Sequence, residues 1–374
     1  MKKLWLFEEK KLWQTGKVYL FLAGGFLLLV TLFGFNSYMS HQENEAIQEE
    51  GQLSKPVMNQ NDFNKEQAAY LEGVNLSIEL QEADFRERAD KGQNIDDILT
   101  LPTYPYYRTA LNKELLSKEL PPQSMRYGTK NSLFAAVFLT YAASILGIIY
   151  ALFLFGDSFS GELEAGTMRL GLSQPIRRRD LFFSKYLLAV LHSFLTIAGL
   201  TGIAFVVGSL FSGGSSIFYP VIVFTEISMT FIPVIQYMLQ VLLLLLFVLL
   251  FCFALHFLIS TIVRKTIVSL TLTVFLLLEG YLVSVSSADF LRKIAHLNPF
   301  TYLNVGKVFI GYDFRSYGQY SIENQEYYAN WCLPRVLHNP SIGMSSGMIC
   351  LIAAAAILLL IGNYCFKRNV YWKK

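Results

Sequence analysis

Long apolar runs recur along this sequence, and the clearest of them, residues 241–260, contains no Asp, Glu, Lys or Arg. A helix needs about 20 largely apolar residues to cross the hydrocarbon core of a bilayer. Runs of this length predict six membrane-spanning helices, at residues 18–38, 132–155, 186–211, 237–262, 266–285 and 345–366. The composition agrees, because 53% of the residues are hydrophobic and 16% are charged, against about 45–50% and about 25% in soluble domains.

The runs predict an all-α polytopic membrane protein. Backbone N–H and C=O groups inside lipid need partners within the protein, and a helix supplies them from its own segment. The first run exceeds the apolar core of a signal peptide, about 7–15 residues, so we interpret it as a retained membrane helix.

The basic residues predict the orientation, because Lys and Arg beside membrane helices are retained in the cytoplasm. With six crossings, both termini lie on one side, together with residues 1–17, 156–185 and 367–374 and the connection at 263–265. This side carries sixteen Lys and Arg against six Asp and Glu, whereas the whole chain has a net charge of only +3. We therefore predict that both termini are cytoplasmic and that residues 39–131 and 286–344 are extracytoplasmic.

The two outer segments differ in character. Residues 39–131 begin with an acidic stretch of low complexity and continue with apolar residues at helical spacing, which predicts helices near 71–85 and 109–120. We favour a small, mainly helical cap over a ligand-binding domain. Residues 286–344 are rich in Tyr, which favours the headgroup layer. Cys332 lies in this aromatic loop, and a disulfide to another chain stays open as an alternative.

Known catalytic patterns are missing from the sequence. It has no phosphate-binding loop of the type G-x-x-x-x-G-K-[ST], no H-E-x-x-H, no C-x-x-C and no G-x-S-x-G. The histidines lack the spacing of metal ligands, and the small net charge excludes a general nucleic-acid binder. We predict no catalytic residue, no metal site and no nucleic-acid partner.

Three polar residues fall inside the predicted spans: Glu279, His256 and His192. An ionised side chain at mid-membrane costs about 2.5–3.5 kcal/mol on insertion scales. One interpretation is a polar site on a substrate path, or an enzyme that uses Glu279 with one of the histidines. The other, which we favour, is that these groups are neutral, hydrogen-bonded, or near an interface.

The most informative segment is the cytoplasmic connection at residues 156–185. On a helix over residues 157–172, the side chains of Phe159, Leu163 and Leu170 share one side, and the acids lie away from it. Pro175 ends this helix, and a group of basic residues follows it before the third span.

This segment resembles the permease subunits of ABC-2 type transporters. Their loop reads roughly D-x-F-S-x-E-x-x-x-G-T-x-x-x-x-L-S-x-P-x-x-R, with a Lys shortly after. The matching residues here are Asp157, Phe159, Ser160, Glu162, Gly166, Thr167, Leu172, Ser173, Pro175, Arg178 and Lys185. Gly171 departs from the pattern, which more often has an apolar residue there.

The resemblance implies a six-helix exporter permease in a bacterial cytoplasmic membrane. Residues 157–172 would be a coupling helix that docks on a separate pair of ATPase subunits, which bind ATP and Mg, so this chain would hold no cofactor. Residues 1–17 would be an interfacial helix. A second permease copy, identical or different, and membrane lipids would be the other partners. An ATP-driven complex that remodels or signals across the envelope without transport is the alternative.

The resemblance also implies roles for single residues. Glu162 would be the principal contact to the ATPase. Gly166 and Thr167 would shape the turn, and Arg178 would fix the loop at the membrane. Asp157, Phe159 and Pro175 complete the predicted coupling set.

Overall fold

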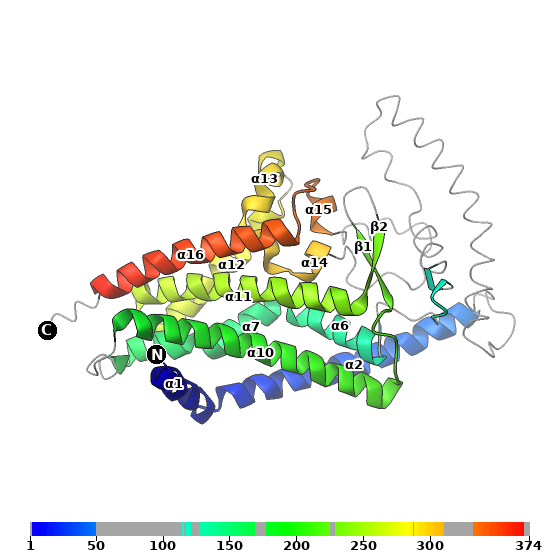
Figure 1. Cartoon of the computed structure of the whole chain (residues 1–374), viewed down its shortest axis with the longest axis horizontal. Helices are drawn as coiled ribbons and strands as arrows, with labels where there is room; N and C mark the ends of the chain where they lie inside the picture. The colour runs from blue at the N-terminus through cyan, green and yellow to red at the C-terminus, as the bar shows by residue number, and fades with distance from the viewer. Residues whose placement is uncertain are drawn as a thin grey trace.

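The computed structural model describes residues 2–49, 114–115, 117–120, 127–168, 177–224, 229–286, 288–309 and 332–369. Most of them form helices that lie side by side (Figure 1). The start of α1 (Lys2–Gln14) and the far end of α16 (Met344–Asn369) lie at the same end of this bundle (Figure 1). An even number of crossings produces this arrangement.

Six helical segments among the described residues are long and apolar enough to cross a membrane. They are α2 (Lys17–Glu49), α7 (Ile145–Phe155) with the following α8 (Asp157–Glu164), α10 (Arg178–Ser212), α11 (Val234–Val263), α12 (Thr266–Ser284) and α16. The predicted fold class is confirmed, and the chain is a multi-pass membrane protein. Since α8 carries three acids and α7 is wholly apolar, we end the second crossing at Phe155.

The centre of the bundle is α11. It is apolar all round, as expected of a helix enclosed by others, and most of its residues are buried. The last helix, α16, packs along it, and α10, α12 and α6 (Asn131–Ala142) also contact it. The clearest apolar run of the sequence, residues 241–260, therefore lies in the central helix of the bundle.

The second span is not the single helix predicted at 132–155. It consists of α6 and α7, and the backbone leaves the helical conformation at Ala143 and Ser144. The Val305 N–H donates to the buried carbonyl of Ala143 at 3.3 Å. A Cβ at Gly147 would lie 2.0 Å from the Ala142 oxygen, so the break depends on the missing side chain there.

A short hairpin joins α10 to α11. Strand β1 (Pro220–Phe224) pairs antiparallel with β2 (Met229–Pro233), with Pro220 opposite Pro233. This pair of strands was not predicted from the sequence. It adds a small two-stranded sheet to a fold that is otherwise helical.

The segment between α12 and α16 packs into the bundle where the structure describes it. It contains α13 (Asp289–Ile294), η1 (Ala295–Leu297), η2 (Pro299–Leu303), α14 (Gly306–Phe309) and α15 (Leu333–Val336). Tyr302 is fully buried, and so is Cys332. The bridge considered for Cys332 would need this region to open. Most of the Tyr-rich stretch lies outside the described residues.

The predicted insertion at 39–131 also lies mostly outside the described residues. At its start, α2 continues to Glu49, beyond the predicted end of the first span at residue 38. The expected helix at 71–85 is not described. Of the expected helix at 109–120, residues 114, 115 and 117 are helical.

We predict that Gly147→Ala destabilises the protein. The added methyl group would collide with the Ala142 carbonyl, and overpacking of this kind costs about 1–3 kcal/mol. The midpoint of thermal unfolding of the purified chain in detergent should fall.

Gly199→Ala is the matched control, because a Cβ there meets nothing within 4 Å and Ala favours helix by up to about 1 kcal/mol over Gly. The midpoint of thermal unfolding of this variant should equal or exceed that of the unsubstituted chain. Equal midpoints for the two variants would contradict our explanation of the break.

Candidate functional site

The site is built around α8, which holds four of the eight motif residues that the structure describes. Asp157 lies in its first turn, where an acid interacts favourably with the helix dipole. The helix predicted to reach residue 172 in fact ends at Glu164, because Gly166 adopts φ +70°. This left-handed conformation commonly ends helices and favours Gly. Residues 169–176, including Pro175, lie outside the described residues.

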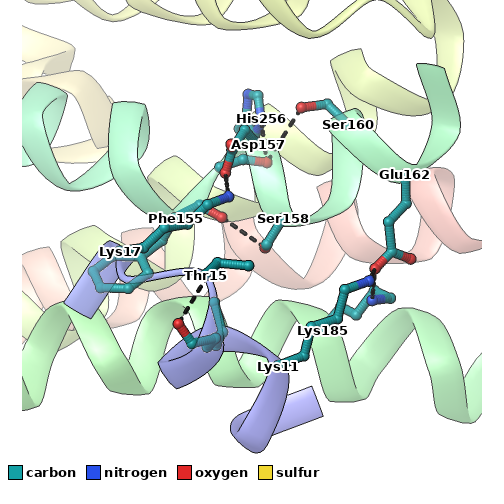
Figure 2. Close-up of polar contacts among 12 residues, drawn as sticks. Lys11, Thr15, Lys17, Phe155, Asp157, Ser158, Ser160, Glu162, Lys185 and His256 are labelled. Atoms are coloured by element: carbon teal, nitrogen blue, oxygen red, sulfur yellow. Dashed lines mark hydrogen bonds and ion pairs between the residues drawn. The ribbon is translucent and has the colours of Figure 1, made fainter. Parts of the chain in front are cut away.

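A buried lysine fixes α8 to two other helices. The Lys185 Nζ of α10 lies 2.6 Å from Glu8 Oε2 of α1 and 2.8 Å from Glu162 Oε1 of α8. The Lys185 side chain is only 2% exposed. Lys11 of α1 also pairs with Glu162, and Figure 2 shows the two ammonium groups meeting at this carboxylate. The network joins α1, α8 and α10.

The charges in this network balance, with two carboxylates and two ammonium groups. Burial raises the pKa of the Glu162 carboxyl, but Lys185 and Lys11 lower it by more, so the pKa lies below its usual value. Glu162 is therefore ionised at neutral pH. Its side chain is 14% exposed and points inward, toward the lysines.

The other two acids of α8 pair with different helices. Asp157 forms an ion pair with Lys17 at the start of α2. Glu164 Oε2 accepts a hydrogen bond of 2.9 Å from the N–H of Thr266, the first residue of α12. A carboxylate at this position satisfies an N–H that has no partner within its own helix.

The apolar side of α8 rests on an aromatic cluster. Phe159 is fully buried, and its ring stacks on Phe257 of α11 with centroids 4.3 Å apart. Phe182 of α10 and Phe366 of α16 lie 5.6 Å and 5.8 Å from the same ring. Aromatic pairs of this geometry add about 0.5–1.5 kcal/mol each beyond their burial. The apolar role predicted for Phe159 agrees with this packing.

One end of α8 stays exposed. Glu164, Ala165 and Thr167 are exposed, and Gly166 is partly so. We call residues 164–167 the α8 tip. Exposed basic residues lie on the connection before α12 and at the start of α10, where Arg178 is the first helical residue. The tip is thus open to a partner, while the body of α8 is fixed.

Sequence reasoning missed several members of this site. Glu8, Lys11, Lys17 and Thr266 were not predicted, and all lie more than 100 residues from their partners in α8 or α10. The sequence places Glu9 on the apolar face formed by Trp5, Leu6, Leu12 and Trp13. In the structure the buried acid of this helix is instead Glu8, which points toward Lys185.

The three polar residues inside the spans do not form one site. His256 is buried and bonds to Gly156 and Thr273. The His192 ring lies against Phe155 and Trp13. Glu279 is exposed on α12. Across the described ranges, no group of three or more His, Cys, Asp or Glu side chains is arranged to hold a metal ion.

Comparison with known families shows to which family the chain is similar. The family model of ABC-2 family transporter proteins matches residues 19–369, nearly the whole chain. No curated protein and no solved structure is significantly similar.

We predict that Lys185→Met strongly destabilises the protein. It would leave Glu8 and Glu162 buried with one ammonium group fewer, and removing one partner of a buried pair costs about 3–5 kcal/mol. The thermal unfolding midpoint in detergent should fall by several degrees.

Lys10→Met, at an exposed position of α1, is the control and should change the midpoint little. Adding Glu8→Gln and Glu162→Gln to Lys185→Met should recover most of the loss, because the network then has no buried ionised group, and Lys11, which loses Glu162, has a side chain that is 45% exposed. If Lys185→Met and Lys10→Met unfold at the same temperature, the network does not stabilise the fold.

Proposed function

We propose, because this chain belongs to the ABC-2 family of transporter proteins, that it is the permease subunit of an ATP-driven exporter. The family match supports a transport permease. The ATPase partner, the direction of transport and the dimer are parts of our proposal. The ATPase would be a separate chain, since the sequence has no phosphate-binding loop of the G-x-x-x-x-G-K-[ST] type.

The observation that carries the proposal is the set of contacts made by α8. Ion pairs connect it to α1, α2 and α10, a hydrogen bond connects it to α12, and aromatic rings connect it to α10, α11 and α16. Force applied to α8 would therefore reach five of the six spans directly. The α8 tip, in which Ala165 and Thr167 are exposed, is available to the partner that applies this force.

This geometry refines the roles that the motif implies. Glu162 holds α8 against Lys185 and Lys11, so we propose that it positions the helix. The α8 tip then makes the contact with the ATPase, with Gly166 and Thr167 shaping its turn. Arg178 is exposed at the start of α10 and suits a lipid phosphate, which attracts a basic side chain by about 1 kcal/mol near an anionic leaflet.

The remaining parts of the proposal follow from charge and symmetry. The start of α1 and the end of α16 lie at the same end of the bundle (Figure 1), and both carry several Lys or Arg residues, which supports cytoplasmic termini. A second permease copy, identical or different, would complete the transport path, and lipids would surround the exposed apolar side chains of the outer helices.

We predict that the α8 tip contacts an ATP-binding protein in the native membrane. A photo-cross-linking residue at Thr167 should attach to a chain that carries a phosphate-binding loop, identified by mass spectrometry. Leu210, also exposed but near the opposite end of α10, is the matched control and should not attach to it.

Glu162→Gln should leave the chain in the membrane but lower cross-linking from Thr167 severalfold, because α8 loses its ion pair with Lys185. Equal cross-linking from positions 167 and 210, or none to an ATP-binding protein, would contradict the proposed docking site.

A further inference from the structure

A buried histidine connects the base of α8 to α12. His256 of α11 has no exposed surface, and its Nε2 lies 3.0 Å from the Gly156 carbonyl oxygen. Its Nδ1 lies 3.1 Å from Thr273 Oγ1 of α12. The imidazole thus bridges two elements that are more than 100 residues apart in the sequence.

The hydrogen-bond partners define the tautomer. A carbonyl oxygen only accepts, so Nε2 carries the hydrogen and donates to Gly156. Nδ1 then accepts from the Thr273 hydroxyl. This hydroxyl also lies 2.7 Å from the Ser269 carbonyl of its own helix, so it has a second acceptor if the imidazole moves away. The link between α11 and α12 can therefore break without leaving a hydroxyl unpaired.

The close approach depends on Gly156, which joins α7 to α8. A Cβ at this position would lie 2.9 Å from His256 Nε2 and 2.5 Å from the Leu152 oxygen. Without a side chain, the imidazole reaches the backbone at the point where α8 leaves α7. Any rotation of α8 about this point moves the carbonyl that His256 binds.

The second attachment of α8 to α12 lies at the helix start. Glu164 binds the Thr266 N–H, and Thr273 follows about two helical turns, roughly 10 Å, along α12. A helix held at one point can swivel, whereas a helix held at two separated points moves with the body that holds it. The two contacts together connect α12 to both ends of α8.

We infer that His256 and Thr273 are positioning residues that make α12 move with α8 when ATP binds. The inference rests on the proposed function, in which an ATPase displaces α8. It adds that this displacement reaches the outer end of α12 and that the Thr273 hydroxyl is required. Neither residue contacts ATP or belongs to the loop motif.

The experiment measures the distance between spin labels at Leu282 of α12 and Leu210 of α10. Both positions are exposed near the outer ends of their helices. The complex is purified with its ATPase and compared without nucleotide and with ATP plus orthovanadate, in a background where the four cysteines are replaced by alanine. We expect a shift of the distance distribution in the unsubstituted complex and a shift reduced by at least half in Thr273→Val.

Three control variants distinguish a loss of the movement passed from α8 to α12 from a simple loss of structure. Thr273→Ser keeps the hydroxyl and should restore the shift. Thr271→Val, an exposed threonine on the same helix, should leave it unchanged. His256→Phe should abolish it while the complex still hydrolyses ATP.

An unaltered shift in Thr273→Val, or no rescue by Thr273→Ser, would overturn the inference. So would the absence of a shift in the unsubstituted complex. In each case, cross-linking of the ATPase from Thr167 would still support the proposed function, so the two failures are distinguishable.

Discussion

The rest of the structure depends on one ammonium group that is held away from water. Lys185 lies near the N-terminal end of α10, and its charge is neutralised by Glu8 of α1 and Glu162 of α8. A buried charge that loses a partner is costly, since the effective desolvation penalty is several kcal/mol per ion. The charge on Lys185 therefore forces three helices that are distant in sequence to stay together.

The orientation of α8 follows from this constraint. With Glu162 turned toward Lys185, Phe159 faces the rings of α10, α11 and α16, and Glu164 reaches the first N–H of α12. Gly166 then ends the helix and leaves its tip exposed. Polar contacts set the direction of the helix, and aromatic packing joins it to the interior of the bundle. A single short helix is thus connected to most of the membrane-spanning part of the chain, as the transmission of force from a partner would require.

The sequence allowed the spans and the position of the site to be predicted, but not its internal contacts. Uncharged runs such as residues 241–260 exceed the length needed to cross a bilayer, so six spans were predictable, and the loop motif resembled the family that the comparison then confirmed. The break at Ala143 was not predictable, because both halves of the span are apolar and only the approach of Gly147 to a carbonyl marks it. The ion pairs of Glu8 and Lys11 join positions 177 and 151 residues apart, and local patterns do not encode such distances.

The central claim is that the ion network holds α1 and α8 together as one rigid unit. The distance between spin labels at Lys10 of α1 and Thr167 of the α8 tip, both exposed, tests this claim most directly in the complex with its ATPase. The account predicts that the distance between these labels stays the same without nucleotide and with ATP trapped by orthovanadate, while the distance from Thr167 to Leu282 of α12 remains equally fixed. A change of the Lys10–Thr167 distance on ATP trapping would show that α1 and α8 separate, and it would contradict the account.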